Sequence, residues 1–229
     1  MFILLSMDIE LKANCNCRCI FCNDYEKGAN QFNDLIRDVA LCKENEFYIC
    51  GNEPLNSVDL IPLILFLRKE KPLAKIYIKS SGVYNYLPVC NFIENIDKIE
   101  LPIYGNDKEM HNYITGNKNA WQKLFDLIDF IVKKGFSHKI LFHTVCLACN
   151  YKSIKDIYDL IISVIGPQDY FKIIYPQKNN LDSNAYRKII VPQRSVIKKL
   201  IEDFDVNTLK KIELINFDSI KKGKFKAVI

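Results

Sequence analysis

Short β-rich runs that alternate with amphipathic helical stretches are the feature that most constrains the fold of this chain. Parallel strands need long crossover connections, usually helices, so this alternation is typical of a parallel α/β fold. No flexible linker or repeat interrupts it, and we expect a single domain over residues 1–229, with a core at about 7–216 and a C-terminal tail at 217–229. The predicted strands cover residues 8–12, 46–50, 75–79, 98–104, 138–145, 170–175 and 211–216. The predicted helices cover residues 32–44, 58–69, 87–95, 121–134, 154–165 and 193–203.

The composition is that of a folded chain without a membrane segment. Hydrophobic residues make up 49% of the 229 residues, which is enough for a sizeable core. The longest apolar runs contain proline and are shorter than the ~20 residues that span a bilayer. The N-terminus lacks the basic start of a signal peptide. We therefore expect a cytoplasmic location, reduced cysteines and no membrane partner.

The basic residues outnumber the acidic ones by 32 to 27, and the excess is concentrated toward the C-terminal end. A basic patch can contact nucleic acid. Neither aromatic interleaving nor a nucleic-acid-binding motif accompanies this one, so we interpret it as a solvated surface and do not expect a nucleic-acid partner. The lysines concerned are Lys198, Lys199, Lys210, Lys211, Lys221, Lys222, Lys224 and Lys226.

Four of the nine cysteines lie within eight residues, and three of them, Cys15, Cys19 and Cys22, have the spacing C-x3-C-x2-C. Structural zinc often uses two C-x2-C pairs separated by a longer loop, and no second pair lies close by. Iron–sulfur clusters are usually held by four Cys thiolates, so a loop that offers three would leave one iron open. A zinc site that also uses Cys17 is an alternative. A disulfide framework is disfavoured because the number of cysteines is odd.

With Phe21 directly before the third cysteine, this stretch resembles the signature C-x3-C-x-aromatic-C of the radical S-adenosylmethionine (radical SAM) superfamily. The resemblance implies a partial (β/α)6 TIM-like barrel of parallel strands, in a short form without the auxiliary-cluster (SPASM-type) extension. It implies a [4Fe–4S] cluster on Cys15, Cys19 and Cys22, with Cys17 as a spacer and Phe21 shielding one side. S-adenosylmethionine (SAM) would chelate the open iron, and reduction would cleave it to a 5′-deoxyadenosyl radical.

A second motif lies directly after the second predicted strand. In parallel α/β architectures the active site lies at the carboxyl ends of the strands. The turn Gly51-Asn52-Glu53-Pro54 resembles the G-G-E-P motif of the same superfamily, which implies that its backbone and Glu53 meet the amino group of SAM. A glycine turn lets the backbone approach closely, and asparagine, here in place of the second glycine, tolerates left-handed backbone angles. An ordinary turn with an exposed glutamate is the alternative.

Further candidates for contacts with SAM lie at the ends of later strands, namely Ser80, Tyr104, His143 and Asn150. Residues 101–116 resemble the segment that follows the fourth strand of many superfamily members, where a strand is followed by a loop with a His-acidic pair and a Thr-Gly turn. Pro102 stands where many members have a serine. His111 in this segment is either a loop-ordering hydrogen-bonding residue or a substrate contact.

The fifth predicted strand ends near a second cysteine pair. Alternation along a strand puts His143 and Val145 on one face, and Thr144 and Cys146 on the other. Cys146 and Cys149 form a C-x2-C pair, but the remaining cysteines are scattered. We therefore interpret both as buried structural thiols, with a role of Cys146 as a hydrogen-atom donor as the alternative.

The substrate does not follow from these motifs. Little sequence precedes the first strand and the tail is short, so an open barrel mouth is expected, which suits a peptide or protein substrate. We predict a peptide-modifying maturase that receives electrons from a flavodoxin or ferredoxin and works with a separate leader-binding protein. The alternatives are a glycyl-radical-enzyme activase, an enzyme acting on a small molecule or nucleoside, and a non-catalytic iron–sulfur or zinc module.

Overall fold

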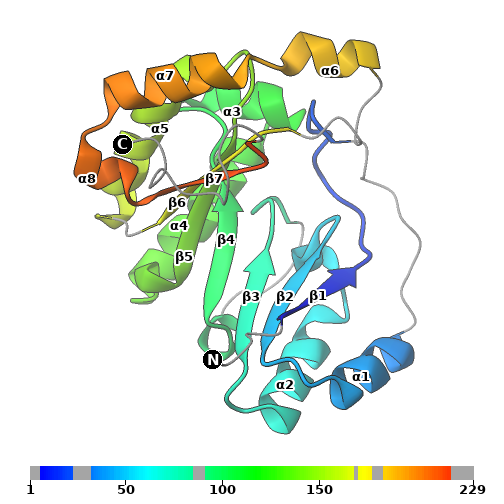
Figure 1. Cartoon of the computed structure of the whole chain (residues 1–229). Coiled ribbons are helices and arrows are strands. Elements are labelled where there is room, and N and C mark those ends of the chain that lie inside the picture. Colours follow the sequence, from blue (N-terminus) through cyan, green and yellow to red (C-terminus); the bar gives the residue numbers. More distant parts are fainter. Residues whose placement is uncertain (1–5, 23–31, 85–90, 168–169, 177–182, 218–229) are drawn as a thin grey trace. The chain divides into compact units, whose positions relative to one another are not determined.

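The structure is a computed structural model, in which residues 6–22, 32–84, 91–167, 170–176 and 183–217 are described (Figure 1). Within these residues seven strands follow one another in the order of the sequence. The β1–β2, β2–β3, β3–β4, β5–β6 and β6–β7 pairings are parallel. This topology confirms the predicted α/β fold class, a partial TIM-like barrel. The strands are β1 (Ser6–Leu11), β2 (Glu46–Gly51), β3 (Lys75–Lys79), β4 (Lys98–Pro102), β5 (Ile140–Val145), β6 (Phe171–Ile174) and β7 (Ile212–Ile215).

Helices connect these strands. The helices are α1 (Phe32–Leu41), α2 (Leu60–Glu70), α3 (Lys108–Thr115), α4 (Ala120–Lys133), α5 (Ile154–Ile165), α6 (Ser183–Ile189), α7 (Gln193–Asp203) and α8 (Val206–Leu209). Among the described residues, none of the helices combines the length and the apolar composition that crossing a bilayer requires.

Contacts along the chain divide it into two compact units. Unit 1 consists of Met1–Cys17, Asp24–Leu101 and Lys123–Ile140, and unit 2 of Arg18–Asn23, Pro102–Gln122 and Leu141–Ile229. The cysteine-rich stretch is therefore shared, with Cys15 and Cys17 in unit 1 and Cys19 and Cys22 in unit 2. A single domain over residues 1–229 stays a prediction.

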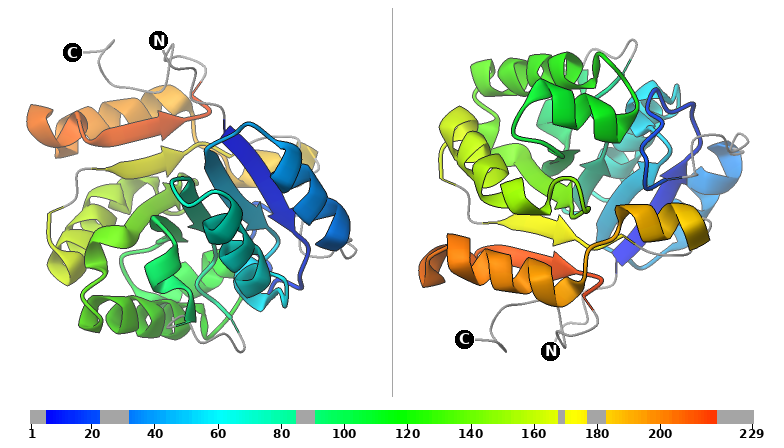
Figure 2. Two further views of the ribbon diagram at one scale, coloured as in Figure 1. Left: turned by 90° about the horizontal axis from the view of Figure 1, so that it is seen from below. Right: turned by 90° about the horizontal axis from the view of Figure 1, so that it is seen from above.

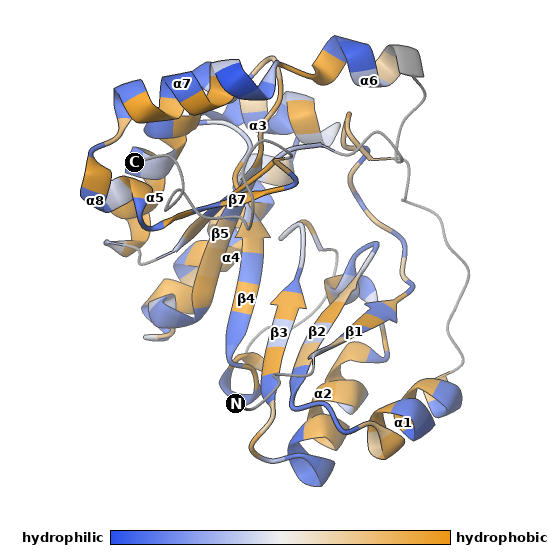
Figure 3. Ribbon diagram, in the orientation of Figure 1, coloured by the Kyte–Doolittle hydropathy of each residue, from blue (hydrophilic) through white to orange (hydrophobic). Residues whose placement is uncertain are grey.

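In unit 1, the two faces of the β2–β3 ladder differ in character. Phe47 and Ile49 of β2 are fully buried, as are Ile76 and Ile78 of β3. Figures 1 and 2 show α1 and α2 on the same side of these strands, and Figure 3 shows the hydrophobic residues of α2. On the opposite face, Tyr48 and its register partner Tyr77 stack with ring centroids 4.6 Å apart. The alternation that predicted these strands is thus an alternation between an apolar and a polar–aromatic face.

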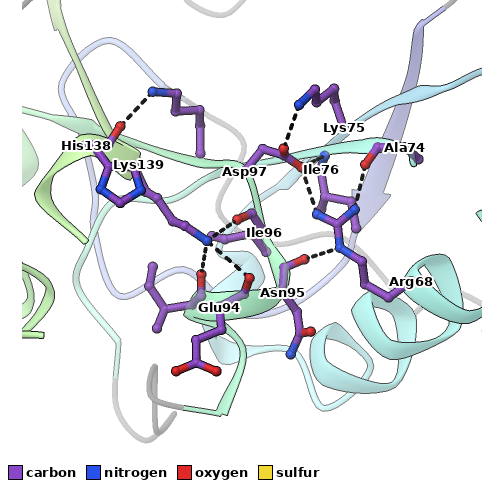
Figure 4. Close-up of polar contacts among 12 residues, drawn as sticks. Arg68, Ala74, Lys75, Ile76, Glu94, Asn95, Ile96, Asp97, His138 and Lys139 are labelled. Atoms are coloured by element: carbon purple, nitrogen blue, oxygen red, sulfur yellow. Dashed lines mark hydrogen bonds and ion pairs between the residues drawn. The ribbon is translucent and has the colours of Figure 1, made fainter. Parts of the chain in front are cut away.

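The amino ends of β3 and β4 in unit 1 are joined by a polar network around Arg68 and Asp97 (Figure 4). The Arg68 guanidinium donates to the carbonyls of Asn95 and Ala74 at 2.7 and 2.6 Å and to the Asp97 carboxylate at 2.7 Å. Asp97 also accepts from the backbone N–H of Ile76 at 2.9 Å. Ion pair and carbonyl contacts therefore fix the loop before β4 to the end of α2.

Lys139 forms a second hydrogen-bond network at the same end of these strands in unit 1. The Lys139 ammonium, just before β5, donates to the carbonyls of Ile93, Glu94 and Ile96 at 2.9, 3.1 and 2.7 Å (Figure 4). Burial lowers the pKa of Lys139. An ammonium group has three donor protons, and all three have carbonyl acceptors here.

Unit 2 packs α5 and α7 with the ladder of β5, β6 and β7. The buried residues of α5 recur at helical spacing, and α7 contributes Val196 and Leu200. Tyr158 of α5 meets the ring of Phe204 edge-on at a centroid distance of 5.4 Å. The buried residues of α5 are Ile154, Ile157, Tyr158 and Ile161.

Three predictions about elements need correction. Residues 108–115, expected as a loop, form α3, which Asp107 caps by accepting the N–H of Met110 at 2.8 Å. The helix predicted over residues 87–95 is wrong in its described part, where Ile93–Asn95 is a 3-10 turn, while residues 87–90 lie outside the described residues. Helices α6 and α8 were not predicted, and of the tail at 217–229 only Phe217 is described.

Candidate functional site

The turn after β2 in unit 1 is built around a glycine and a buried glutamate. Gly51 has a φ of 122°, and a Cβ atom there would lie 2.2 Å from the carbonyl oxygen of Leu11, so only glycine fits. Glu53 is fully buried. One of its carboxylate oxygens accepts from the N–H of Leu55 at 3.1 Å and the hydroxyl of Ser80 at 2.6 Å. The other accepts from the N–H of Ser81 at 2.9 Å and from the Ser81 hydroxyl.

Glu53 therefore joins the ends of β2 and β3. Burial raises the pKa of its carboxyl, and the hydrogen bonds from Ser80 and Ser81 act in the opposite direction. Four donors meet its two oxygens within the protein, so the carboxylate is held in one orientation. The contact of Glu53 with the amino group of SAM stays a prediction. Ser80, which was also predicted as a site residue, donates a hydrogen bond to Glu53.

The first half of the cysteine stretch is tied to these turns of unit 1. The side-chain amide of Asn56 donates to the carbonyl of Asn14 at 2.9 Å, and that of Asn16 donates to the carbonyl of Val83 at 2.9 Å. The N–H of Val83 in turn donates to the Ser81 hydroxyl at 3.1 Å. The chain around Cys15 is thus fixed by the turns that follow β2 and β3.

The two cysteines of this half differ in exposure. Cys17 is 1% exposed and belongs to the core of unit 1, whereas Cys15 is partly exposed. A side-chain hydrogen bond with Cys17 and burial raise the pKa of the Cys15 thiol, so a metal must displace its proton. This difference fits the predicted register, in which Cys15 is a ligand and Cys17 is a spacer.

The second half of the stretch lies in unit 2, against α3. The backbone N–H groups of Arg18 and Ile20 donate to the carbonyls of Thr115 at 2.8 Å and Ile114 at 3.0 Å. Cys22 N–H donates to the carbonyl of Cys19 at 2.9 Å, so these two partly exposed thiols share one turn. The side chains of Cys19, Ile20 and Phe21 pack on an apolar cluster formed by Tyr104, Ile114, Val145 and Leu147.

Tyr104, Phe21 and Asn150 are brought together in unit 2. The ring of Phe21 meets that of Tyr104 edge-on at 5.2 Å. The amide of Asn150 donates to the carbonyls of Tyr104 at 2.8 Å and Val145 at 3.0 Å and accepts from the N–H of Leu147 at 2.8 Å. Asn150 is fully buried. It joins the segments after β4 and β5, and a contact with SAM stays a prediction for it and for Tyr104.

His111 of α3 orders the same segment. Its Nδ1 accepts from the backbone N–H of Tyr104 at 3.2 Å, which favours the tautomer with the proton on Nε2. The side chain is fully buried, and burial lowers its pKa to about 4. Its ring stacks on Tyr104 and meets Trp121 edge-on. These contacts favour the predicted loop-ordering role of His111 over a contact with the substrate.

In β5, burial alternates from Ile140 to Thr144 as predicted, but Val145 is buried as well. Thr144 is fully buried, whereas His143 is partly exposed and pairs in register with Lys172 of β6. Cys146 is fully buried and burial raises its pKa, whereas Cys149 is exposed. The prediction that both thiols are buried is therefore wrong for Cys149, whose side chain is exposed, whereas a buried structural role for Cys146 stays the favoured prediction.

Sequence reasoning missed the residues that hold the motifs in place. Ser81, Asn16 and the carbonyls at the end of α3 carry no motif of their own. The only sequence signals were the Ser-Ser pair after β3 and the glycine after Thr115. Pro54 is buried in the 3-10 turn Pro54–Asn56 that Glu53 caps, and contacts of Asn52 and Pro54 with SAM stay predictions.

Within the described residues, no group of three or more His, Cys, Asp or Glu side chains is gathered as a metal site. The donor set nevertheless fits an iron–sulfur cluster in its chemistry. Cys15, Cys19 and Cys22 are partly exposed thiols, and Cys17 is withdrawn into the core. Thiolate ligands also suit zinc, the alternative metal considered above.

Comparisons with known proteins gave matches among solved structures only. No family model matches the sequence, and no curated protein matches it. The structures of Streptococcus suis SuiB bound to precursor peptide SuiA and to S-adenosylmethionine match with TM-scores of 0.65 at 18% and 16% identity. They cover 86% and 96% of this chain but 45% and 54% of SuiB, so the chain spans about half the length of that protein.

Two other structures match at a similar level. Native anSMEcpe with bound AdoMet and Cp18Cys peptide has a TM-score of 0.68 at 18% identity, covering 86% of this chain and 58% of its own. TYW1 with a lysine-pyruvate adduct bound has a TM-score of 0.59 at 16% identity, covering 86% of this chain and 72% of its own. The chain therefore has the fold of the radical SAM enzymes, as represented by SuiB, anSMEcpe and TYW1.

Proposed function

We propose that this protein is a radical SAM enzyme in which Cys15, Cys19 and Cys22 bind a [4Fe–4S] cluster and SAM completes its coordination. The observation that carries the proposal is the C-x3-C-x2-C spacing directly after β1 in a chain with this fold. When bound, the cluster and SAM supply a reductive cleavage that yields a 5′-deoxyadenosyl radical, which abstracts hydrogen from the substrate. Electrons come from a flavodoxin or ferredoxin.

The protein's own residues orient the ligands. Glu53 fixes the turn after β3, and that turn holds Asn16 beside Cys15 through the Val83 carbonyl. On the other half of the stretch, the ring of Phe21, the residue before Cys22, packs edge-on against Tyr104. Positioning by rigid neighbours matters in such sites because small displacements of reacting groups are costly.

For the substrate, we propose a peptide or protein, modified with the help of a separate leader-binding protein. Two of the structurally similar proteins support this, because SuiB was crystallised with precursor peptide SuiA and anSMEcpe with the Cp18Cys peptide. The match to TYW1, which holds a lysine-pyruvate adduct, supports a small-molecule or nucleoside substrate as the second candidate. Fold similarity at this identity does not transfer a substrate by itself.

The test of the cofactor chemistry is turnover of SAM. Anaerobically reconstituted protein, reduced with dithionite, should convert SAM to 5′-deoxyadenosine, and Cys19→Ala should abolish both the absorbance near ~400 nm and the turnover because it removes a thiolate ligand. Cys17→Ala is the matched control, since a buried spacer thiol is not needed for the cluster. A fully loaded wild-type protein without turnover would refute the radical SAM function and leave a non-catalytic iron–sulfur module.

The substrate is tested separately. Peptides encoded beside the gene would be incubated with the active enzyme in deuterated and unlabelled form. Deuterium in the 5′-deoxyadenosine is expected from a peptide substrate. Transfer only from a small molecule would favour the second candidate, and a glycyl radical formed on a partner enzyme would favour an activase.

A further inference from the structure

The carboxyl end of α3 is completed by the cysteine stretch. The last carbonyls of a helix have no intrahelical partners and need other donors. Here the carbonyls of Ile114 and Thr115 accept the backbone N–H groups of Ile20 and Arg18 at 3.0 and 2.8 Å. Two alternate residues of the stretch are therefore fixed to one helix end, with Cys19 between them.

Gly116, which ends α3, lets this contact form. Its φ of 61° is in the left-handed region, which glycine adopts without strain. A Cβ atom at Gly116 would lie 2.5 Å from the carbonyl oxygen of Arg18 and 3.1 Å from the Arg18 Cβ. The first distance is far below a van der Waals contact, so any larger residue must displace either the end of α3 or the cysteine stretch.

Apolar packing completes the contact. Cys19, Ile20 and Phe21 pack on the cluster that contains Ile114 of α3 and Tyr104. The turn from Cys19 to Cys22 follows directly, closed by the 2.9 Å hydrogen bond between their backbones. All of these contacts lie in unit 2 and none involves a metal.

We infer that the carboxyl end of α3 is a preformed seat that orders Cys19 and Cys22 before any metal binds, with Gly116 as its positioning residue. The seat itself rests on the contacts above. Its consequence, that a cluster assembles faster and more completely on ordered thiols, rests on the proposed function. Preorganised ligands bind more tightly because less conformational freedom is lost on binding.

Hydrogen exchange of the metal-free protein tests the seat directly. The Arg18 and Ile20 amides should exchange slowly in the wild type and on the order of tenfold faster in Gly116→Ala, the change expected when one backbone hydrogen bond is lost. Gly135→Ala is the matched control. Gly135 also follows a helix with a positive φ of 81°, but a Cβ there would meet nothing within 4 Å.

A second variant distinguishes the steric effect of a Cβ atom at position 116 from the effect of backbone strain. It also keeps the test possible if Gly116→Ala folds poorly. Asparagine tolerates the left-handed conformation but carries the same Cβ. Gly116→Asn should therefore release the two amides as Gly116→Ala does, while Gly135→Asn should not. Unchanged exchange in folded Gly116→Asn, or equal release in the Gly135 variants, would overturn the seat.

Iron loading tests the consequence. Under limiting iron and sulfide, the wild type and Gly135→Ala should approach about four irons per chain, as a [4Fe–4S] cluster requires, and the Gly116 variants should load about tenfold more slowly. The reduced cluster of a Gly116 variant should also give a shifted electron paramagnetic resonance spectrum, which a general loss of stability would not produce. Equal loading and identical spectra would overturn the positioning role.

These results are independent of turnover. A wild-type protein with slow amide exchange that loads iron but does not cleave SAM would refute the proposed function and keep the seat. A protein that cleaves SAM while the Gly116 variants exchange and load like the wild type would refute the seat alone.

Discussion

Protonation of His111 should limit the stability of the protein at mildly acidic pH. In the folded protein burial lowers the pKa of His111 to about 4, whereas a histidine in the unfolded chain has a pKa of about 6.5. The unfolded chain therefore binds a proton more readily than the folded one. The stability that neutral His111 contributes is complete above about pH 6.5 and is lost as the pH falls through about 4.

The size of the effect follows from the two pKa values. A difference of one in pKa corresponds to about 1.4 kcal/mol, so the full loss is about 3 kcal/mol, of which about 2 kcal/mol falls between pH 7 and pH 5. That is a large fraction of the free energy of unfolding of a typical domain, which is roughly 5–15 kcal/mol. It should be measurable above the pH range in which most carboxylates titrate.

The assay is urea denaturation of the metal-free protein at several values between pH 5 and pH 7, for the wild type and His111→Asn. Asparagine can still accept the hydrogen bond from the Tyr104 N–H but does not titrate. The other two histidines, His138 and His143, are the same in both proteins, so the difference between the two free energies isolates His111. The variant should be less stable than the wild type at pH 7, and the gap should shrink by about 2 kcal/mol at pH 5. A gap that does not change with pH would refute the reasoning.

Two further predictions concern unit 1. Glu53→Gln should lower the free energy of unfolding by about 1–3 kcal/mol, because the amide nitrogen of glutamine cannot accept the hydrogen bonds that one carboxylate oxygen of Glu53 accepts. Urea denaturation at pH 7 measures this change. A variant as stable as the wild type would contradict the hydrogen bonding described for the carboxylate. Arg68→Met should cost about 2 kcal/mol, because it removes one of the donors to Asp97 and the side-chain donor to two carbonyls. Lys133→Met, which removes an exposed ion pair with Asp129, should cost at most about 0.5 kcal/mol. Equal costs in urea denaturation would contradict a stabilising role of the network around Arg68.

Strands were predicted well where burial alternates clearly. The predicted range 75–79 coincides with β3, whose burial alternates along its length, whereas the start of β1 was placed two residues late because Ser6 and Met7 lack a strong pattern. Helix α3 was missed for a different reason. It is only eight residues long and has few apolar residues, and its contacts with residues 18–20, which are distant in sequence, help to define its end.

The candidate site was predicted in its motifs but not in its supports. Glu53 was placed at a strand end from the sequence, but its partner Ser81 lies 28 residues away, and neither side chain indicates the pairing. The predicted contact of Asn150 with SAM stays a prediction, whereas its described hydrogen bonds, all of them to backbone groups, were not predicted. Side-chain to backbone contacts over long sequence separations depend on tertiary packing, which local patterns do not encode.

The hydrogen-bond networks around Arg68 and Lys139 lie at the amino ends of β3, β4 and β5. The motif residues Gly51 and Glu53 of unit 1 lie instead at and after the carboxyl end of β2. The networks around Arg68 and Lys139 and the residues of the proposed site therefore lie at opposite ends of the strands in this unit. For protein engineering, this means that thermal robustness can be increased at the amino ends of the strands by better packing or further ion pairs. The turns at the other end, which carry the residues of the proposed site, need not be altered to obtain it.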